Sequence, residues 1–359
     1  MQLIIGIIAF IFMLSVIVII HEWGHFMVAR HYGVYCHEFS IGMGPALYQK
    51  KGKETTFSIR AIPFGGYVMM AGEEDGSQDE QEDDWLKNVP DDRRLNHKPW
   101  PQQICIMLAG IFMNLVLAWV IFVGVAMARG YVVEPAKPVV YKIQENSPAQ
   151  QAGLQKDDRI LKATSGTESI KPETQYDLLE WMQYHHDTIT LTVRRDQSTF
   201  ETQIKPQYDK ENSIYTIGYQ AIAYAKNIQW YEAFGVGTQD FAESSTAIFQ
   251  SLNMLIHGQG YENLSGPVGI FSVTSRTTQM GILAYLSLFA MISLNIGIFN
   301  AIPIPALDGG RVLITLIEAI FRRKVNQQVV EKIIMVSFAL LMMLFVFATY
   351  NDIARLIRK

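Results

Sequence analysis

Four long apolar runs dominate the pattern of hydrophobic and polar positions. The first covers residues 3–20, which carry no charge, and the second has its apolar centre at residues 104–128. The third lies between Arg276 and Asp308, and the fourth covers residues 333–351. A helix needs about 20 apolar residues to cross a bilayer, so each run is long enough to span one. A cleaved signal peptide explains the first run poorly, because no basic region precedes it and no small-residue cleavage site follows it.

The distribution of Lys and Arg around these runs predicts their orientation. Residues 29–98 hold nine Lys and Arg and residues 309–332 hold five, whereas the tail after the fourth run holds three and the N-terminus none. The long segment 129–276 is left out of the count, because large domains are translocated largely regardless of charge. We therefore expect both termini and segment 129–276 outside, and both positively charged segments in the cytosol.

The composition agrees with membrane segments beside at least one soluble domain. Hydrophobic residues make up 49% of the 359 residues and charged residues 18%, and the mean hydropathy is +0.12. A typical soluble domain carries about 25% charged residues. The net charge of −4 argues against nucleic acid as a partner. Two cysteines cannot form a disulfide framework.

The first apolar run ends in the sequence His21-Glu22-Trp23-Gly24-His25, the spacing of a zinc site. On a helix, residues four apart are rotated by about 40°, so both imidazoles can share one metal ion. Glu22 lies beside them and is placed to act as a general base. The alternative is that the two histidines merely cap a helix at a membrane interface. Ionisable groups next to an apolar span are costly and usually functional, which favours the metal site.

A catalytic zinc site needs a third protein ligand and an open position. The next histidines, His31 and His37, lie at or beyond the end of the expected helix. Asp308 is a better candidate, within the sequence NAIPIPALDGG at residues 300–310 that closes the third run. The first and third runs cross in the same direction and carry their motifs toward their cytosolic ends. The two histidines of the first motif and Asp308 can therefore meet at one depth.

The two motifs together resemble the site-2 protease family of intramembrane metalloproteases, and within it the regulator-of-sigma-E group of bacterial members. Residues 39–42, 63–68 and 265–269 add to the resemblance, which covers nearly the whole chain. It implies that His21, His25 and Asp308 bind Zn²⁺ and that Glu22 activates water.

The resemblance also implies a substrate-binding role for residues near the two motifs. An intramembrane amide at Asn300 could bond the backbone of an unwound substrate; the alternative is a helix-breaking polar residue before two prolines. The expected substrate-binding residues are Asn300, Pro303, Pro305, Gly65 and Gly66.

Residues 46–70 are expected to form a β-hairpin that turns around residues 50–54. A transmembrane substrate must unwind before an amide can reach a metal, and an edge strand could pair with the unwound segment. A plain cytosolic hairpin is the alternative, whereas the resemblance favours a membrane-reentrant hairpin. Residues 73–84, with eight acids in twelve positions, are expected to form a solvated loop.

The outer segment resembles a circularly permuted bacterial PDZ domain. Ser147 is expected to cap a short helix that begins at Pro148 and stops at Gly153. Asp157 stands where the family usually has glycine, so the turn there is expected to be strained or differently shaped. Strands are expected at residues 159–163, 188–193, 199–204 and 215–219, with a helix at 176–185.

These observations predict a polytopic α-helical membrane protein with four transmembrane helices, a membrane-associated β-hairpin region and one α+β PDZ domain between helices 2 and 3. The expected segments are transmembrane helix 1 with the histidine motif (1–28), the cytosolic or reentrant hairpin region with the acidic loop (29–101), transmembrane helix 2 (102–128), the PDZ domain (129–223), amphipathic membrane-surface helices (224–276), transmembrane helix 3 with the aspartate motif (277–308), a cytosolic loop (309–332), transmembrane helix 4 (333–351) and a tail (352–359).

The predicted function is that of an intramembrane zinc endopeptidase in the bacterial inner membrane. The resemblance implies single-pass transmembrane substrates, namely a pre-cleaved anti-sigma factor and remnant signal peptides, with the lipid bilayer as the other partner. The PDZ domain would exclude large substrates or bind a new C-terminus. A metal transporter is one alternative, but Phe26 follows the second histidine where such transporters carry glutamate. A non-catalytic zinc-binding membrane protein is the other, and the presence of Glu22 argues against it.

Overall fold

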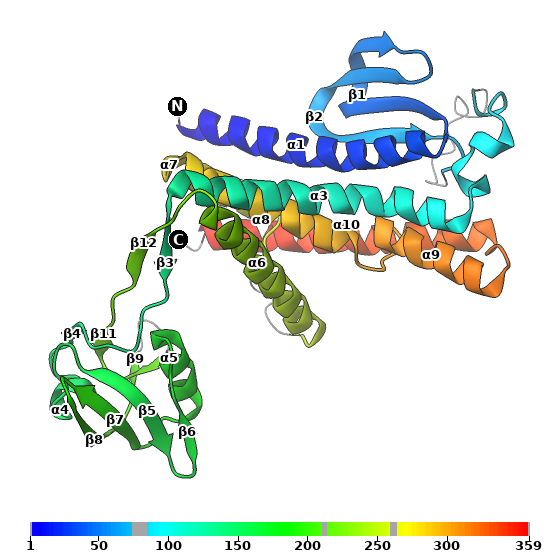
Figure 1. Cartoon of the computed structure of the whole chain (residues 1–359). Coiled ribbons are helices and arrows are strands. Elements are labelled where there is room, and N and C mark those ends of the chain that lie inside the picture. Colours follow the sequence, from blue (N-terminus) through cyan, green and yellow to red (C-terminus); the bar gives the residue numbers. More distant parts are fainter. Residues whose placement is uncertain (1, 74–84, 210–213, 259–263, 358–359) are drawn as a thin grey trace. The chain divides into compact units, whose positions relative to one another are not determined.

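The computed structural model describes residues 2–73, 85–209, 214–258 and 264–357. The chain divides into two compact units (Figure 1). Residues 1–129 and 231–359 form a helical unit, and residues 130–230 form a second unit rich in β-strands. The residues expected to form the acidic loop lie outside the described part of the chain, except for Glu73.

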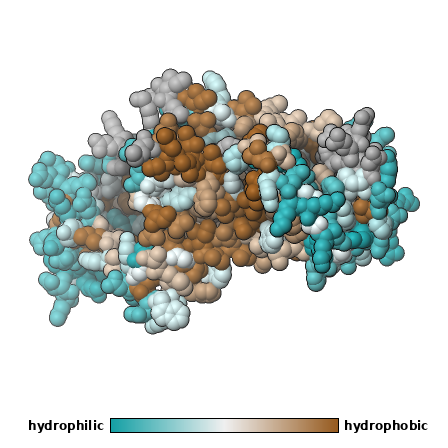
Figure 2. Space-filling view, turned by 90° about the horizontal axis from the view of Figure 1, so that it is seen from above, coloured by the Kyte–Doolittle hydropathy of each residue, from teal (hydrophilic) through white to brown (hydrophobic). Residues whose placement is uncertain are grey.

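The helical unit is built on four long apolar helices, whose arrangement is drawn in Figure 1. All four are long and apolar enough to cross a membrane, and they coincide with the four apolar runs. Hydrophobic side chains cover much of their outer surface in a broad band (Figure 2). The helix nearest the C-terminus is the most exposed: only 6% of its most apolar 18-residue stretch is buried, as expected of a helix that lipid surrounds. These helices are α1 (Gln2–His31), α3 (Trp100–Arg129), α8 (Ile282–Asn300) and α10 (Gln327–Ile357).

Shorter helices correct two of the expected segments. The region expected as one helix at 277–308 is interrupted on both sides, because Gly281 separates α7 from α8 and Pro303 and Pro305 cannot continue α8 past Asn300. The segment 309–332, expected as a cytosolic loop, contains most of an amphipathic helix that begins at Asp308. The shorter helices are α6 (Glu232–Ile256), α7 (Pro267–Gln279), α9 (Asp308–Phe321), η1 (Asp91–Arg93) and η2 (Leu95–His97).

The segment at residues 265–269 fixes the start of α7 against α10. Asp352 is buried, and its Oδ2 accepts hydrogen bonds from the backbone N–H groups of Gly266 and Gly269, at 2.8 and 2.7 Å. A Cβ at Gly269 would lie 2.6 Å from Oδ1 of this carboxylate. The glycines therefore allow α10 to cap the N-terminus of α7, where backbone N–H groups lack partners within the helix.

A hairpin of two long strands, β1 (Cys36–Lys51) and β2 (Thr56–Met70), follows α1 and is longer than predicted. It folds back on itself, since Ile41 of β1 lies opposite both Ile59 and Gly66 of β2. Residues 66–70 consequently lie at one edge. The Ser15 hydroxyl of α1 donates to the carbonyl of Pro63 at 2.6 Å, which ties this part of the hairpin to α1.

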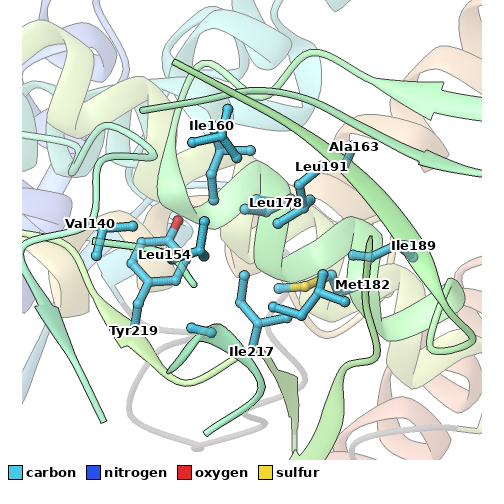
Figure 3. Packing of buried hydrophobic residues seen from close by; sticks show 13 residues of the cluster. Val140, Leu154, Ile160, Ala163, Leu178, Met182, Ile189, Leu191, Ile217 and Tyr219 are labelled. Atoms are coloured by element: carbon cyan, nitrogen blue, oxygen red, sulfur yellow. The ribbon is translucent and has the colours of Figure 1, made fainter. Parts of the chain in front are cut away.

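The second unit is built on an antiparallel sheet with strand order β6-β5-β7-β8. Helix α5 (Gln175–Tyr184) packs Leu178 and Met182 onto the apolar side chains of the sheet (Figure 3). The expected strand at 199–204 is β8, which pairs with β7, and the expected strand at 215–219 is divided between β10 and β11, which pair with β9 and β4. The strands and the short helix are β3 (Tyr131–Glu134), β4 (Lys142–Ile143), α4 (Pro148–Gln151), β5 (Arg159–Ser165), β6 (Glu168–Ile170), β7 (Ile189–Arg195), β8 (Ser198–Ile204), β9 (Gln207–Asp209), β10 (Ile214–Thr216), β11 (Tyr219–Gln220) and β12 (Tyr224–Asn227).

Local signals in this unit act as the sequence predicts. The Ser147 side chain caps α4 by accepting from the backbone N–H of Gln150 at 3.3 Å. Gly153 follows with a φ of 72°, and Asp157 adopts a φ of 71°, the left-handed region in which non-glycine residues are strained.

Candidate metal centre

Three side chains able to bind a metal, from opposite ends of the sequence, meet in the helical unit. His21 and His25 lie one turn apart on α1, and Asp308 is the first residue of α9. Their ligand atoms all lie within 4.8 Å of one another. Oδ2 of Asp308 lies 3.1 Å from Nε2 of His21 and 3.4 Å from Nε2 of His25, and the two Nε2 atoms are 3.2 Å apart.

The separations and the chemistry of these three groups fit zinc. Two ligands bound at about 2.0–2.1 Å to a tetrahedral zinc stand about 3.3 Å apart, close to the three distances observed. Oδ2 of Asp308 is buried and has no hydrogen-bond partner among the described residues. An acceptor in that position is costly unless a cation binds it. Two imidazoles and one carboxylate also leave a fourth position open, as a catalytic zinc site requires.

Hydrogen bonds from α3 orient both imidazoles. Nδ1 of His25 lies 2.8 Å from the carbonyl of Ile106, so Nδ1 donates and Nε2 keeps its lone pair. Nδ1 of His21 lies 3.3 Å from the amide nitrogen of Asn114, a fully buried residue whose amide oxygen has no partner among the described residues. Turning this amide by 180° puts the oxygen against Nδ1–H of His21, and Nε2 is then free to bind a metal.

Small residues let α3 approach the two histidines closely. A Cβ at Gly110 would lie 2.3 Å from Nε2 of His25 and 2.8 Å from Cε1 of His21. A Cβ at Gly24 of α1 would lie 2.5 Å from the carbonyl oxygen of Ala109. Any larger residue at either glycine would push the two helices apart at the level of the imidazoles.

The two glycines after Asp308 position the carboxylate. A Cβ at Gly309 would lie 2.3 Å from the carbonyl oxygen of Ala301, and a Cβ at Gly310 would lie 2.1 Å from that of Ile304. The segment between α8 and α9 therefore packs directly on the first turn of α9. This contact places Asp308 at the helix start, facing α1.

The three side chains border a cavity of about 260 Å³. Glu22 lines it beside the two imidazoles, and residues 67–70 at the edge of β2 line it as well. Arg311, about one turn after Asp308, also lines the cavity and forms an ion pair with Glu73. The Glu22 carboxylate, the candidate metal site and a strand edge thus share one cavity.

The lining of this cavity includes none of the five expected substrate-binding residues. Asn300 is the last residue of α8, and Pro303 and Pro305 follow in the connection to α9. Gly65 has a φ of 79°, and a Cβ at Gly66 would lie 2.7 Å from the carbonyl oxygen of Ser40 on the neighbouring strand. The backbone at Gly65 and Gly66 therefore requires glycine for structural reasons.

Comparison with known proteins identifies the family. A sequence profile of peptidase family M50 matches residues 9–344. The chain belongs to peptidase family M50. A Clostridium acetobutylicum protein, provisionally named a zinc metalloprotease, is 34% identical over 98% of this chain and 97% of its own length. The zinc metalloprotease RasP of Shouchella clausii is 28% identical over 97% of this chain and 98% of its own length. The M50 chain is accordingly a zinc metalloprotease, with four helices long and apolar enough to cross a membrane.

Solved structures also match part of the chain. The PDZ domain of an SdrC-like protein from Listeria monocytogenes is 16% identical and has a TM-score of 0.21. The match covers 25% of this M50 chain and 93% of the Listeria domain.

Several residues at the site were not found from the sequence. Asn114 is the only strongly polar residue between residues 104 and 128, and a lone polar group in an apolar span is a usable signal of a buried contact. Arg311 and Glu73 are 238 positions apart, and no local pattern links them. The carbonyl of Ile106 leaves no trace in the sequence, since every residue carries one.

Proposed function

We propose that this M50 protein is an intramembrane endopeptidase, with Zn²⁺ held by His21, His25 and Asp308 and with Glu22 as the general base. The three mutual distances of 3.1 to 3.4 Å between the ligand atoms are the observation that carries the proposal. His21 and His25 belong to α1, which is long and apolar enough to span a bilayer, and this location favours substrates within the membrane.

The reaction depends on a proton transfer by Glu22. When bound, zinc supplies Lewis-acid activation of a water molecule and of the scissile carbonyl. The Glu22 carboxylate, which lines the cavity beside the imidazoles, accepts the proton of the attacking water. It then gives this proton to the leaving amine, so that the glutamate ends the cycle ionised.

We further propose that the substrate binds as an added strand along residues 66–70. This edge pairs with β1 on one side, and its residues line the cavity. Main-chain hydrogen bonds to an unwound segment would hold a peptide bond near the candidate metal site whatever its side chains. Asn300 and the Pro303–Pro305 segment would then contact the substrate from the side of α8.

The remaining proposals concern substrates and location. We propose single-pass transmembrane substrates, of which a pre-cleaved anti-sigma factor and remnant signal peptides are the expected examples. The second unit, as a PDZ domain outside the bacterial inner membrane, would exclude large substrates or bind a new C-terminus. The distribution of Lys and Arg supports a cytosolic location of the hairpin and α9.

The structure disfavours a transporter site at this motif. Phe26, where the transporter pattern carries glutamate, is buried with Phe39 and Val68 in a core between α1 and the hairpin. A side chain in this position cannot serve a transported ion without losing that packing.

Zinc content and cleavage of a single-pass model substrate, measured together, test the proposal. The Glu22→Gln variant should keep stoichiometric zinc and lose cleavage, whereas His25→Ala should lose both. His31→Ala is the matched control, because His31 lies on the same helix but is exposed and outside the site. Zinc in the parent protein without cleavage of any truncated substrate would refute the enzymatic role.

A further inference from the structure

A second hollow, of about 350 Å³, lies between the start of α3 and the C-terminal end of α9. Its lining includes four Lys and Arg side chains and one tryptophan. Lys98 lies two residues before α3, Trp100 is the first residue of α3, and Arg322, Arg323 and Lys324 follow the last turn of α9. None of these residues belongs to the candidate metal centre.

The positive charge of this hollow is largely uncompensated. Glu318 is the one carboxylate in its lining, and it is engaged with its own loop: it pairs with Lys324 at 3.1 Å and accepts from the backbone N–H of Val325 at 2.8 Å. Within the described part of the chain, Lys98, Arg322 and Arg323 have no ion pair. Three like charges around one hollow repel each other unless an anion lies among them.

Exposed apolar side chains accompany these cations, at Trp100 in the lining of the hollow and at the two residues that precede Arg322 in the chain. Trp100 is 51% exposed, and Ile320 and Phe321 at the end of α9 are 73% and 70% exposed. Tryptophan and basic residues at the end of a membrane-spanning helix are typical of the membrane–water interface. A small free anion would contact only the cations. A phospholipid can contact the cations with its phosphate and the exposed apolar side chains with its acyl chains.

We infer that this hollow binds the headgroup phosphate of an anionic phospholipid. Lys98 and the two arginines face the phosphate, and the exposed apolar side chains of α9 lie against the acyl chains. Arginine guanidinium groups suit this role, because two parallel N–H groups can bind two phosphate oxygens.

The position of the hollow connects it to the candidate metal centre. Helix α9 begins with Asp308 and ends at the hollow, and 14 residues span about 20 Å. A small cavity between the two sites shares Glu73 and Arg311 with the catalytic cavity and Thr315 and Glu318 with the hollow. A lipid that holds the end of α9 would therefore also fix the helix that carries Asp308; this consequence rests on the proposed function.

Lipid binding tests the site without reference to catalysis. The full-length Glu22→Gln protein is delipidated in neutral detergent and titrated with phosphatidylglycerol or phosphatidylcholine, with bound lipid measured by native mass spectrometry. Lys98→Gln/Arg322→Gln/Arg323→Gln should weaken phosphatidylglycerol binding at least tenfold, because each cation near an anionic headgroup contributes about a factor of five. The matched control is Lys50→Gln/Lys51→Gln/Lys53→Gln, which removes the same charge from exposed positions at the hairpin turn.

Three outcomes of the lipid titration would overturn the inference. They are unchanged phosphatidylglycerol binding by the first triple variant, an equal loss in the control variant, and equal binding of phosphatidylcholine by the parent. Displacement of the lipid by millimolar inorganic phosphate would assign the hollow to a soluble anion instead.

Cleavage by the parent protein in vesicles with and without phosphatidylglycerol is measured separately; activity independent of this lipid would refute the coupling to α9. Absence of cleavage in every vesicle would refute the proposed function and leave the binding result valid.

Discussion

Removing the amide of Asn114 is expected to weaken zinc binding without unfolding the protein. The residue is fully buried on α3, and its amide lies 3.3 Å from Nδ1 of His21. Asn114→Leu keeps a side chain of similar size and removes the only partner that the described structure offers to this ring nitrogen. The imidazole can then carry its proton on Nε2, the nitrogen that faces Asp308, and a protonated nitrogen cannot bind a metal.

The expected loss follows from the role of the hydrogen bond. Groups that orient a metal-ligating histidine typically contribute 10- to 100-fold in metal affinity. This factor corresponds to about 1.4–2.7 kcal/mol of binding free energy. The cost of leaving a buried ring N–H without a partner is about 1–3 kcal/mol, which is of the same size. We therefore expect the zinc dissociation constant to rise by about one to two orders of magnitude.

Competition with a chromogenic chelator in detergent measures this constant, using Glu22→Gln as the parent to prevent self-cleavage. Asn114→Asp should bind zinc nearly as tightly as the parent, because a carboxylate oxygen still accepts from Nδ1–H. Ser293→Ala is the matched control: its hydroxyl donates to the backbone carbonyl of Asn114 at 2.9 Å, so its loss disturbs the α3–α8 contact but not the imidazole. Unchanged zinc affinity in Asn114→Leu, or an equal loss in Ser293→Ala, would refute the reasoning.

Three further predictions concern packing, capping and pH. Gly110→Ala should abolish zinc binding, because its Cβ would lie 2.3 Å from an imidazole nitrogen. Gly124→Ala on the same helix is the control: a Cβ there meets no neighbouring side chain or helix within 4 Å, so the zinc content should be unchanged. Asp352→Ala should lower stability by about 2 kcal/mol, since two backbone N–H groups at the start of α7 lose their acceptor; an unchanged midpoint of thermal unfolding would contradict this. The hydrogen bond to the carbonyl of Trp181 and the neighbouring Glu168 carboxylate raise the pKa of His185 above 6.5. The resulting stabilisation is complete below pH 6.5 and lost as the pH rises through the raised pKa, so the difference in unfolding midpoint between the parent and His185→Gln should shrink over this range.

The part of the fold that depends on local pattern could be predicted from the sequence. Long apolar runs specify α1, α3, α8 and α10, because only a helix satisfies its own backbone in lipid. The spacing of His21 and His25 fixes their common face on any helix, so the candidate ligand pair needed no tertiary information. The cap of α4 and the turn at Asp157 in the second unit were predictable for the same reason, since such features are encoded within a few residues.

The errors arise where tertiary contacts decide the local structure. Residues 309–332 were expected to be a loop because charge was counted and the apolar face of α9 was not. The position of this helix depends on contacts with distant parts of the chain, since α9 packs against α3. Its first turn depends on Gly309 and Gly310, which let it pack on the carbonyls of the preceding segment.

The break before Asp308 shows why the site depends on that misjudged region. If the third run had continued as one helix through residue 308, the orientation of the Asp308 carboxylate would have depended on the rotation of that whole helix about its axis. Pro303 and Pro305 end α8 instead, and α9 restarts at Asp308 with its first turn held against the connection. The aspartate thus stands at a helix start fixed by backbone contacts on one side and facing the two imidazoles on the other. A rigid carboxylate at 3.1 to 3.4 Å from two nitrogen atoms is what a preformed metal site requires, and an unbroken helix would not have supplied it.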